Sequence, residues 1–302
     1  MSTNAVLITP PAAGIPRALA LPTGRLARTW RRFRRQRLSV ISLIIVGVIA
    51  LAGLLAPVIA PYDPAAISGN FMAGPSAAHW FGSDGTGRDL LSRMLFGARL
   101  SLLGTLIAVS VGGSAGIVLG MVSGYAGGLL DMLVMRCIDA LLSFPGLLTA
   151  MVLVAVLGSG EVQAMVGLAV AFMPFITRVV RGQVLAVREE DYVEAAKVIG
   201  APTQWIVRRH VLANILPPLI IVLAQLLGAA IVVEGALAFL GISVQPPQTS
   251  LGSLLQDGFA NINVTPRLIV IPGVAITLLA TSFNAIADGL RDALANQDFE
   301  AS

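Results

Sequence analysis

The sequence predicts an all-helical integral membrane protein with six transmembrane helices, and three observations lead to this class. Hydrophobic residues make up 56% of the 302 residues. Charged residues make up only 12%, about half of the roughly 25% that is usual in soluble proteins. The stretch 38–60 contains no charged residue, and as a helix it would be about 35 Å long, enough to cross a bilayer.

A basic tail precedes this first span. Eight arginines lie between Arg17 and Arg37, and no acidic residue occurs before Asp63. Such a run could bind nucleic acid or acidic lipid, but beside a span it acts as a topology anchor, because basic residues stay on the cytoplasmic side. We therefore interpret 1–37 as a cytoplasmic tail that meets membrane lipid and not nucleic acid. The span is too long for a cleaved secretory signal.

Further apolar runs with few charged residues complete one membrane domain, 38–292. The six spans are expected at 38–60, 100–125, 137–158, 162–182, 214–240 and 268–288. An even number of spans places both termini in the cytoplasm, with 293–302 as a second short tail. Sixteen of the 20 basic residues then lie inside, and four lie outside, as basic residues in such proteins do. The four are Arg88, Arg93, Arg99 and Arg267.

Three loops between the spans are long enough to carry function. The outer loop 61–98 is rich in glycine and acidic residues, which predict turns, and the second outer loop is 241–267. Neither is long enough to form a second globular domain. The inner loop 183–213 holds a dense group of charges, so it must meet water or another protein.

The composition excludes several kinds of chemistry. One cysteine, Cys137, and two histidines cannot build a disulfide framework or a Cys/His metal site within the chain. Lys197 is the only lysine and follows Ala196, whereas a phosphate-binding loop needs Gly-Lys-Ser/Thr. We therefore expect no enzyme activity, no nucleotide site and no cofactor in this chain.

Four glycines follow one another at four-residue spacing in the second span. They form one flat stripe on a helix, which predicts close packing of another helix. The first two also match the Gly-x-Ser-x-Gly motif of a catalytic serine, but that motif needs a preceding strand, so catalysis is not expected here. The four are Gly112, Gly116, Gly120 and Gly124.

Three charged residues are expected at membrane depth, where charge is costly unless it faces protein or a water-filled path. Arg136 and Asp139 are three residues apart and can share a helix face, so we expect them to pair. Glu234 has no charged neighbour in the sequence. It is the best candidate for a residue of a translocation path, and a carboxylate bonded between helices is the alternative. Asp139 and Arg136 are weaker candidates for the same path.

The inner loop reads as a short helix, a turn and a second helix. Acidic residues at its start suit the positive end of a helix dipole, and Glu194 is the last of them. Ala195 and Ala196 make a narrow helix that can enter a groove, and Gly200 can end it before Pro202 starts the next one. On periodicity alone, a solvated loop helix is an equally fair interpretation.

Residues 194–212 resemble the Glu-Ala-Ala loop of permease subunits of bacterial ABC importers. In that family Glu-Ala-Ala is followed by three residues, Gly, and after nine more residues a hydrophobic-x-Leu-Pro ending. Here the ending is His210-Val211-Leu212-Ala213, so the hydrophobic residue and the proline are both replaced. We expect Ala213 to straighten the start of the fifth span.

The resemblance extends from about residue 30 to 296 and is to the second permease of dipeptide, oligopeptide and nickel importers. Two smaller departures are Leu251, where the family has Trp, and Ala287, where it has Gly. The segments that carry the likeness are Pro61-Tyr62-Asp63-Pro64, His79-Trp80-Phe81-Gly82-Ser83-Asp84, Gly87-Arg88-Asp89-Leu90-Leu91-Ser92-Arg93, Gly97-Ala98-Arg99-Leu100-Ser101-Leu102, Phe239-Leu240-Gly241 and Asp288-Gly289-Leu290-Arg291-Asp292.

This resemblance implies the type I ABC importer permease fold with a cytoplasmic coupling helix, in the bacterial inner membrane. It implies a second homologous permease, one or two cytoplasmic subunits that bind ATP and Mg²⁺, and an external solute-binding protein. Di- or oligopeptides are the expected substrates, although the family also carries glutathione-like peptides and nickel complexes. The residues implied in coupling to the ATPase are Glu194, Ala195, Ala196, Gly200, Arg208 and Arg209.

Two other functions fit parts of the sequence. An ion-coupled secondary transporter would use Asp139 and Glu234 as relays, and its uptake would need an ion gradient instead of ATP. A membrane scaffold would bind partners and move no solute. The extent of the family resemblance favours the importer over both.

Overall fold

The structure of the protein is a computed structural model, of which residues 23–295 are described. The described part is helical, and its only β-type pairings are two isolated bridges in the segment 60–89. The elements are α1 (Thr23–Phe33), α2 (Arg37–Leu54), α3 (Ala56–Ile59), α4 (Leu90–Ala126), α5 (Gly128–Leu142), α6 (Gly146–Leu157), α7 (Glu161–Arg188), α8 (Asp191–Val198), α9 (Thr203–Ile206), the π-helix η1 (Val207–Val211), α10 (Leu212–Phe239), α11 (Leu251–Ala260) and α12 (Arg267–Ala295).

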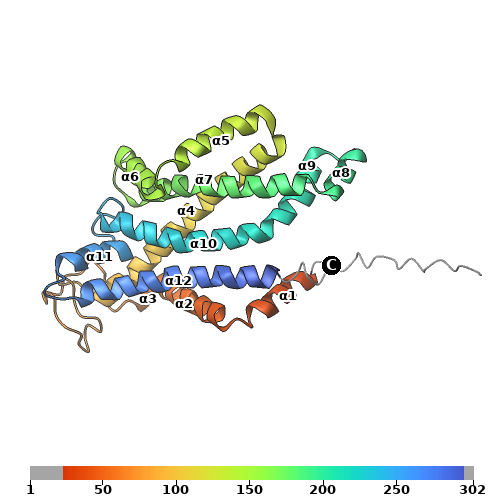
Figure 1. The fold of residues 1–302 in the computed structure, drawn as a ribbon. Helices are drawn as coiled ribbons and strands as arrows, with labels where there is room; N and C mark the ends of the chain where they lie inside the picture. Colours follow the sequence, from red (N-terminus) through yellow and green to blue (C-terminus); the bar gives the residue numbers. More distant parts are fainter. Residues whose placement is uncertain (1–22, 296–302) are drawn as a thin grey trace, which may run out of the picture.

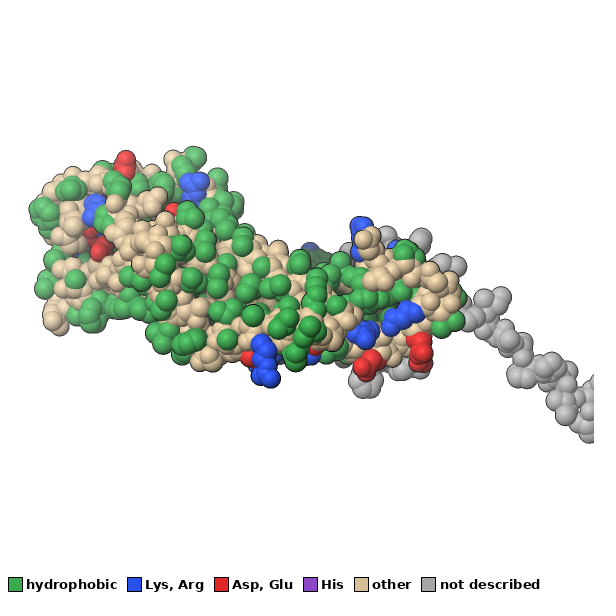
Figure 2. Space-filling model, turned by 90° about the horizontal axis from the view of Figure 1, so that it is seen from above, with side chains coloured by type: hydrophobic (Ala, Val, Ile, Leu, Met, Phe, Trp, Pro, Cys, Tyr) green, Lys and Arg blue, Asp and Glu red, His purple; other side chains and the backbone are tan. Residues whose placement is uncertain are grey.

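The long helices run side by side and give the molecule two distinct ends (Figure 1). Helices α1, α8 and α9 lie at one end, which we call the α8 end. Helix α11 and the segment 60–89 lie at the other, which we call the α11 end. Hydrophobic side chains cover much of the surface between the ends. Charged side chains lie at both ends, and a few also lie midway along one edge (Figure 2).

Five helical runs are long and apolar enough to cross a membrane. They are α2, α4, α7, α12 and the continuous run Thr203–Phe239, which joins α9, η1 and α10. The bent pair of α5 and α6 makes a sixth if it counts as one span. The predicted fold class, all-helical with six spans, is confirmed.

The third span, expected at 137–158, is not one continuous helix. Helices α5 and α6 meet at a 90° bend, and the break covers residues 143–145. Pro145 explains the break, because proline lacks an N–H and disfavours a helical conformation of the residue before it. An apolar run indicates that a segment can lie in the membrane, but it does not show whether the segment is one continuous helix.

The glycine stripe of α4 packs directly on α7, as predicted. A Cβ atom on Gly112 would lie 2.4 Å from the carbonyl oxygen of Ala169, and one on Gly120 would lie 2.6 Å from that of Thr177. Gly116 and Gly124 are also buried against α7. The absence of side chains at these four positions therefore sets the distance between the two helices.

Part of the basic tail is a helix, which the sequence reasoning missed. Helix α1 packs against α12, and its Phe33 is buried and stacks on Trp30 with 5.8 Å between ring centroids. The guanidinium of Arg34 lies 4.7 Å from the centre of the Trp30 ring. The other expectations for the two tails fall on residues 1–22 and 296–302, outside the described residues.

Candidate functional site

Helices α8 and α9 form the predicted helix–turn–helix. Helix α8 has acidic residues in its first turn, and Gly200 follows its end with a φ of +80°. The N–H of Ala201 donates to the carbonyl of Ala196, and the N–H of Gly200 donates to that of Lys197, both at 3.0 Å. This pair of hydrogen bonds is the Schellman motif, so Gly200 ends the helix because glycine adopts a positive φ without strain.

One face of α8 is packed inside the protein. Val193 and Ala196 are buried and cluster with Ile206 of α9, while Tyr125 and Val187 pack around them. The small side chain at position 196 therefore serves the packing of α8 against its own chain. In the structure it does not face outward beside Ala195, which is exposed.

The opposite face of α8 is open. Glu194, Ala195 and Lys197 are exposed, and so is Gly200 beyond the helix end. Val198 and Ile199 are 82% and 81% exposed, although both are β-branched apolar residues. Large apolar side chains this open at a charged helix end indicate a contact surface for another protein. The sequence reasoning overlooked them, although an apolar pair at the end of a charged helix was visible.

The α8–α9 unit is joined rigidly to the fifth span. Arg208 and Arg209 lie exposed on η1, which continues into α10 without a loop. The Asn214 side chain donates hydrogen bonds to the Tyr192 hydroxyl at 3.1 Å and to the His210 carbonyl at 2.7 Å. These bonds tie α8 to the foot of α10.

A second charged group lies where α5 meets α7. The predicted pair of Arg136 with Asp139 is wrong, because Asp139 instead pairs with Arg178 of α7 at 2.5 Å. Arg181 holds Asp131 through two contacts of 2.6 Å. Spacing along one helix could not reveal these partners, which come from a different helix.

Arg136 is left alone by this arrangement. Its side chain is exposed on α5 and makes no ion pair with any residue in the described part of the chain. The pair of Asp139 and Arg178 is about half exposed on the same flank. Bare hydrocarbon would disfavour these charges, so this flank is suited to protein or to water.

Glu234 is buried in the protein interior, at 7% exposure. The hydroxyl groups of Ser101 and Ser250 face its carboxyl group, and its Oε2 atom has no hydrogen-bond partner among the described residues. Glu234 and Glu161 line one cavity of about 10 Å³. The position lies between α10, α4 and the start of α11, which matches the alternative of a carboxyl group held between helices.

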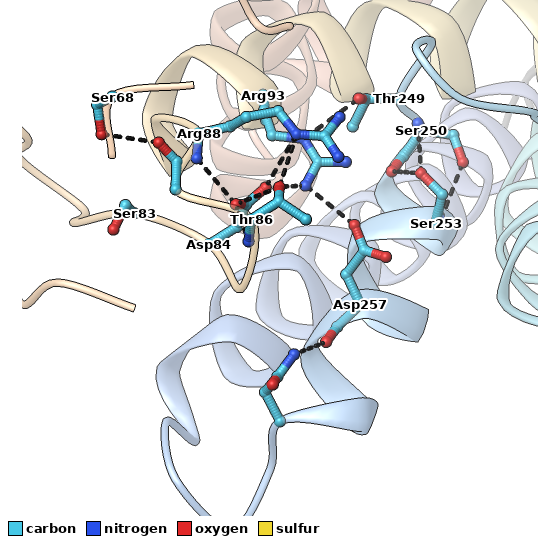
Figure 3. A network of polar contacts seen from close by, with 12 residues as sticks. Ser68, Ser83, Asp84, Thr86, Arg88, Arg93, Thr249, Ser250, Ser253 and Asp257 are labelled. Atoms are coloured by element: carbon cyan, nitrogen blue, oxygen red, sulfur yellow. Dashed lines mark hydrogen bonds and ion pairs between the residues drawn. The ribbon is translucent and has the colours of Figure 1, made fainter. Parts of the chain in front are cut away.

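At the α11 end, a network of polar contacts centres on Asp84 (Figure 3). Its carboxylate accepts hydrogen bonds from the backbone N–H groups of Thr86 at 2.8 Å and Arg88 at 2.9 Å. Arg93 of α4 pairs with Asp84 and reaches Asp257 of α11 at 2.9 Å. One buried arginine thus joins the segment 60–89 to two helices.

A second set of contacts closes the same end. Asp89 caps α4 by accepting from the Ser92 N–H at 2.8 Å, and it also contacts the His79 ring at 2.8 Å. Arg267 at the start of α12 donates to the carbonyls of Phe81 at 3.2 Å and Ser83 at 3.1 Å. The segment 60–89 is therefore a folded cap that is fixed to α4, α11 and α12.

The Asp84 network gives a prediction for acidic conditions. Burial raises the pKa of Asp84, but the hydrogen bonds from Arg88 and Thr86 and the charge of Arg93 outweigh it, so the pKa lies below 3.8. Because the pKa of Asp84 is lower in the folded cap than in the unfolded chain, ionised Asp84 stabilises the cap at any pH above the unfolded pKa. This stabilisation is lost as the pH falls through the pKa of the folded state. We expect amide exchange protection of residues 68–88 to hold from pH 7 to 5 and to fall below about pH 4.

The variant Asp84→Asn should lose this protection already at pH 7. The free energy of opening of the cap should fall by about 3 kcal/mol, because the variant leaves the buried charge of Arg93 partly uncompensated. Asp63→Asn is the control, since Asp63 is exposed in the same segment. Equal amide exchange of residues 68–88 in Asp84→Asn and in the native chain would show that the Asp84 carboxylate does not stabilise the cap.

The spans, the open helical unit at one end and the folded cap at the other define a multi-pass membrane protein of the transport class. Residues 116–297 match the family described as "Binding-protein-dependent transport system inner membrane component". Residues 24–75 match "N-terminal TM domain of oligopeptide transport permease C". The chain belongs to this family of transport permeases. It is an ABC importer permease subunit of a bacterial inner membrane, and its family works with ATPase and solute-binding partners.

Similar proteins include the "Glutathione transport system permease protein GsiD" of Escherichia coli O6:K15:H31 (strain 536 / UPEC) and of Shigella boydii serotype 4 (strain Sb227). Each is 39% identical over 267 residues, which is 88% of either chain. A solved structure described as inward-facing MetNI methionine ABC transporter has a TM-score of 0.47 and 22% identity, over 63% of this chain and 94% of that one.

Proposed function

We propose that this chain is one of two permease subunits of an ATP-driven importer that moves di- or oligopeptides into the cytoplasm. The α8 end and both termini lie on the cytoplasmic side, and the α11 end faces outward toward the solute-binding protein. The distribution of basic residues supports this orientation. Helices α1, α8 and α9 lie at the α8 end (Figure 1), and both α1 and the segment 188–209 are rich in basic residues.

The observation that carries the proposal is the open α8–α9 unit that continues into a span. An ATPase subunit that binds Val198, Ile199 and Glu194 would be connected to α10 through α9 and η1, which form one continuous helical run with it. When two ATPase subunits bind ATP and close, they would tilt α10. The translocation path would then close toward the cytoplasm and open toward the outside. ATP and Mg²⁺ are bound in those partners, and this chain supplies no cofactor site.

The predicted coupling residues take different parts in this scheme. Glu194 and Ala195 lie on the docking face, and Gly200 closes α8 so that Ile199 projects beyond it. Ala196 acts from the inner face by keeping α8 close to α9. Arg208 and Arg209 lie exposed beside the docking face and meet acidic groups of the partner or lipid phosphates.

We place the translocation path along the α5–α7 flank, between this chain and the second permease. Arg136, Asp139 and Arg178 are exposed there, and a path filled with water would solvate them. The unpaired cation of Arg136 suits the carboxylate that every peptide carries at its C-terminus. The glutathione systems to which similar permeases belong also carry a peptide-like substrate.

Reversal of one charge on the docking face tests the proposal. We expect Glu194→Lys to lower peptide uptake roughly tenfold, because the loss of one interfacial charge pair costs at least about 1.4 kcal/mol. Radiolabelled dipeptide uptake by cells would be compared with the amount of the chain in the membrane, which should not change because Glu194 is exposed.

Glu189→Lys is the matched control, since Glu189 is exposed just before α8 and lies outside the docking face. Its uptake should remain close to that of the native chain. Normal uptake by Glu194→Lys would remove this residue from the mechanism.

A further inference from the structure

Arg99 differs from the other arginines expected on the outer side. Arg88 donates to Thr86, Arg93 holds two carboxylates, and Arg267 donates to backbone carbonyls. Arg99 is only partly exposed, yet it makes no hydrogen bond or ion pair with any residue that the structure describes. Burial of an unpaired cation is costly, so a partly buried guanidinium is stabilised by an anionic or polar partner from outside the chain.

The position of Arg99 is fixed where the first span ends. Helix α2 crosses α4 so closely that a Cβ atom on Gly53 would lie 2.9 Å from the backbone nitrogen of Arg99. Gly53 is the second-last residue of α2, which ends at Leu54. Arg99 therefore lies at the depth where the hydrocarbon of the membrane gives way to the headgroups.

Two hollows meet at this side chain. The outer one has a volume of about 460 Å³ and lies under the folded cap, beside Asp63 and Gln248. The inner one, of about 270 Å³, lies between α2, α4, α10 and α12. Its walls are almost entirely apolar, and they include Leu54, Leu102, Leu106, Leu227 and Phe283.

One polar atom in the inner hollow also lacks a partner. The Oγ1 atom of Thr105 is buried, with the residue at 1% exposure, and it has no hydrogen-bond partner among the described residues. Thr105 lines the same hollow as Arg99. The two residues are six positions apart on α4, so about 9 Å separates their levels along the helix.

We propose that Arg99 binds the phosphate of a glycerophospholipid of the outer leaflet, with one acyl chain in the inner hollow. The guanidinium forms charge-assisted hydrogen bonds with the phosphate, and Thr105 donates its hydroxyl proton to an ester oxygen deeper in the site. The assignment to the outer leaflet rests on the proposed orientation of the chain. A polar head above an apolar hollow matches a lipid better than a peptide, which would leave the inner hollow empty.

The test measures lipid bound to the chain, purified in mild detergent with its partner subunits from native membrane. Arg99→Gln should lower the phospholipid retained per chain roughly tenfold, as the loss of a hydrogen bond to a charged group does. A photoactivatable phosphatidylglycerol in the same preparation should crosslink to α2 and α4 of the native chain and not to those of the variant.

Two further variants sharpen the result. Ala50→Phe fills the inner hollow and leaves Arg99 in place, so it should also displace the lipid. Arg88→Gln removes an outer arginine that already has a partner, and it should retain the lipid. Unchanged lipid in Arg99→Gln and Ala50→Phe would overturn the proposal. Crosslinking of the phosphatidylglycerol to a partner permease instead of to α2 and α4 would also overturn it. So would a loss of peptide uptake in Arg99→Gln with lipid retained, which would assign Arg99 to substrate. Because lipid retention is measured without transport, the lipid result can fail while the proposed function holds, and the reverse.

Discussion

Gly112→Leu should strongly destabilise the folded chain. A Cβ atom at position 112 would lie 2.4 Å from the backbone carbonyl oxygen of Ala169, and backbone cannot rotate away as a side chain can. Relief would require α4 and α7 to separate along the most extensive helix contact among the described residues. We expect a loss of roughly 3 kcal/mol or more, measured as a lower midpoint of thermal unfolding in detergent and less chain in the membrane.

Gly182→Leu is the matched control for this variant. Gly182 lies on α7 within the same pair of helices, but no atom lies within 4 Å of a Cβ built there. The larger side chain should leave the unfolding midpoint unchanged or slightly raised, since leucine favours helix more than glycine does. Equal stability of Gly112→Leu and the native chain would show that the stripe does not set the helix distance.

Ile199→Asp should separate the chain from its ATPase subunits while leaving its fold intact. The side chain of Ile199 is 81% exposed, so its replacement removes almost no packing within the chain. In a complex, a buried isoleucine contributes about 1.5–3 kcal/mol, and an unpaired carboxylate in its place adds a further cost. We expect co-purification of the ATPase and peptide uptake both to fall at least roughly tenfold.

Ile67→Asp makes the same exchange at the opposite end of the molecule, where Ile67 is 66% exposed. It should leave ATPase co-purification unchanged. If Ile199→Asp still recovers the native amount of ATPase, the α8 end is not the docking surface.

The features that the sequence predicted well depend on local patterns. Uncharged runs reveal spans because lipid excludes charge, and glycines four residues apart reveal a contact face because helix geometry aligns them. The helix–turn–helix of the inner loop was visible from Glu194 and Gly200 for the same reason. Each of these signals lies within about twenty residues of chain.

The features that were missed depend on partners far apart in the sequence. Asp139 pairs with Arg178 and not with Arg136, because the choice depends on how α5 lies against α7. Arg93 joins Asp84 to Asp257, which lies 164 residues away from Arg93, so the network has no local signature. The bend before α6 was also missed, because Pro145 sits in a run whose apolar character dominated the interpretation.

The central claim is that partner ATPases drive transport through this permease. The most direct test reconstitutes the chain with its partner permease, ATPase subunits and solute-binding protein in liposomes that contain ATP and have no ion gradient. Our account predicts that labelled peptide enters only when ATP is present, and that proton and sodium ionophores do not stop it. Uptake without ATP that collapses when ionophores remove an imposed ion gradient would contradict the account and would identify an ion-coupled transporter.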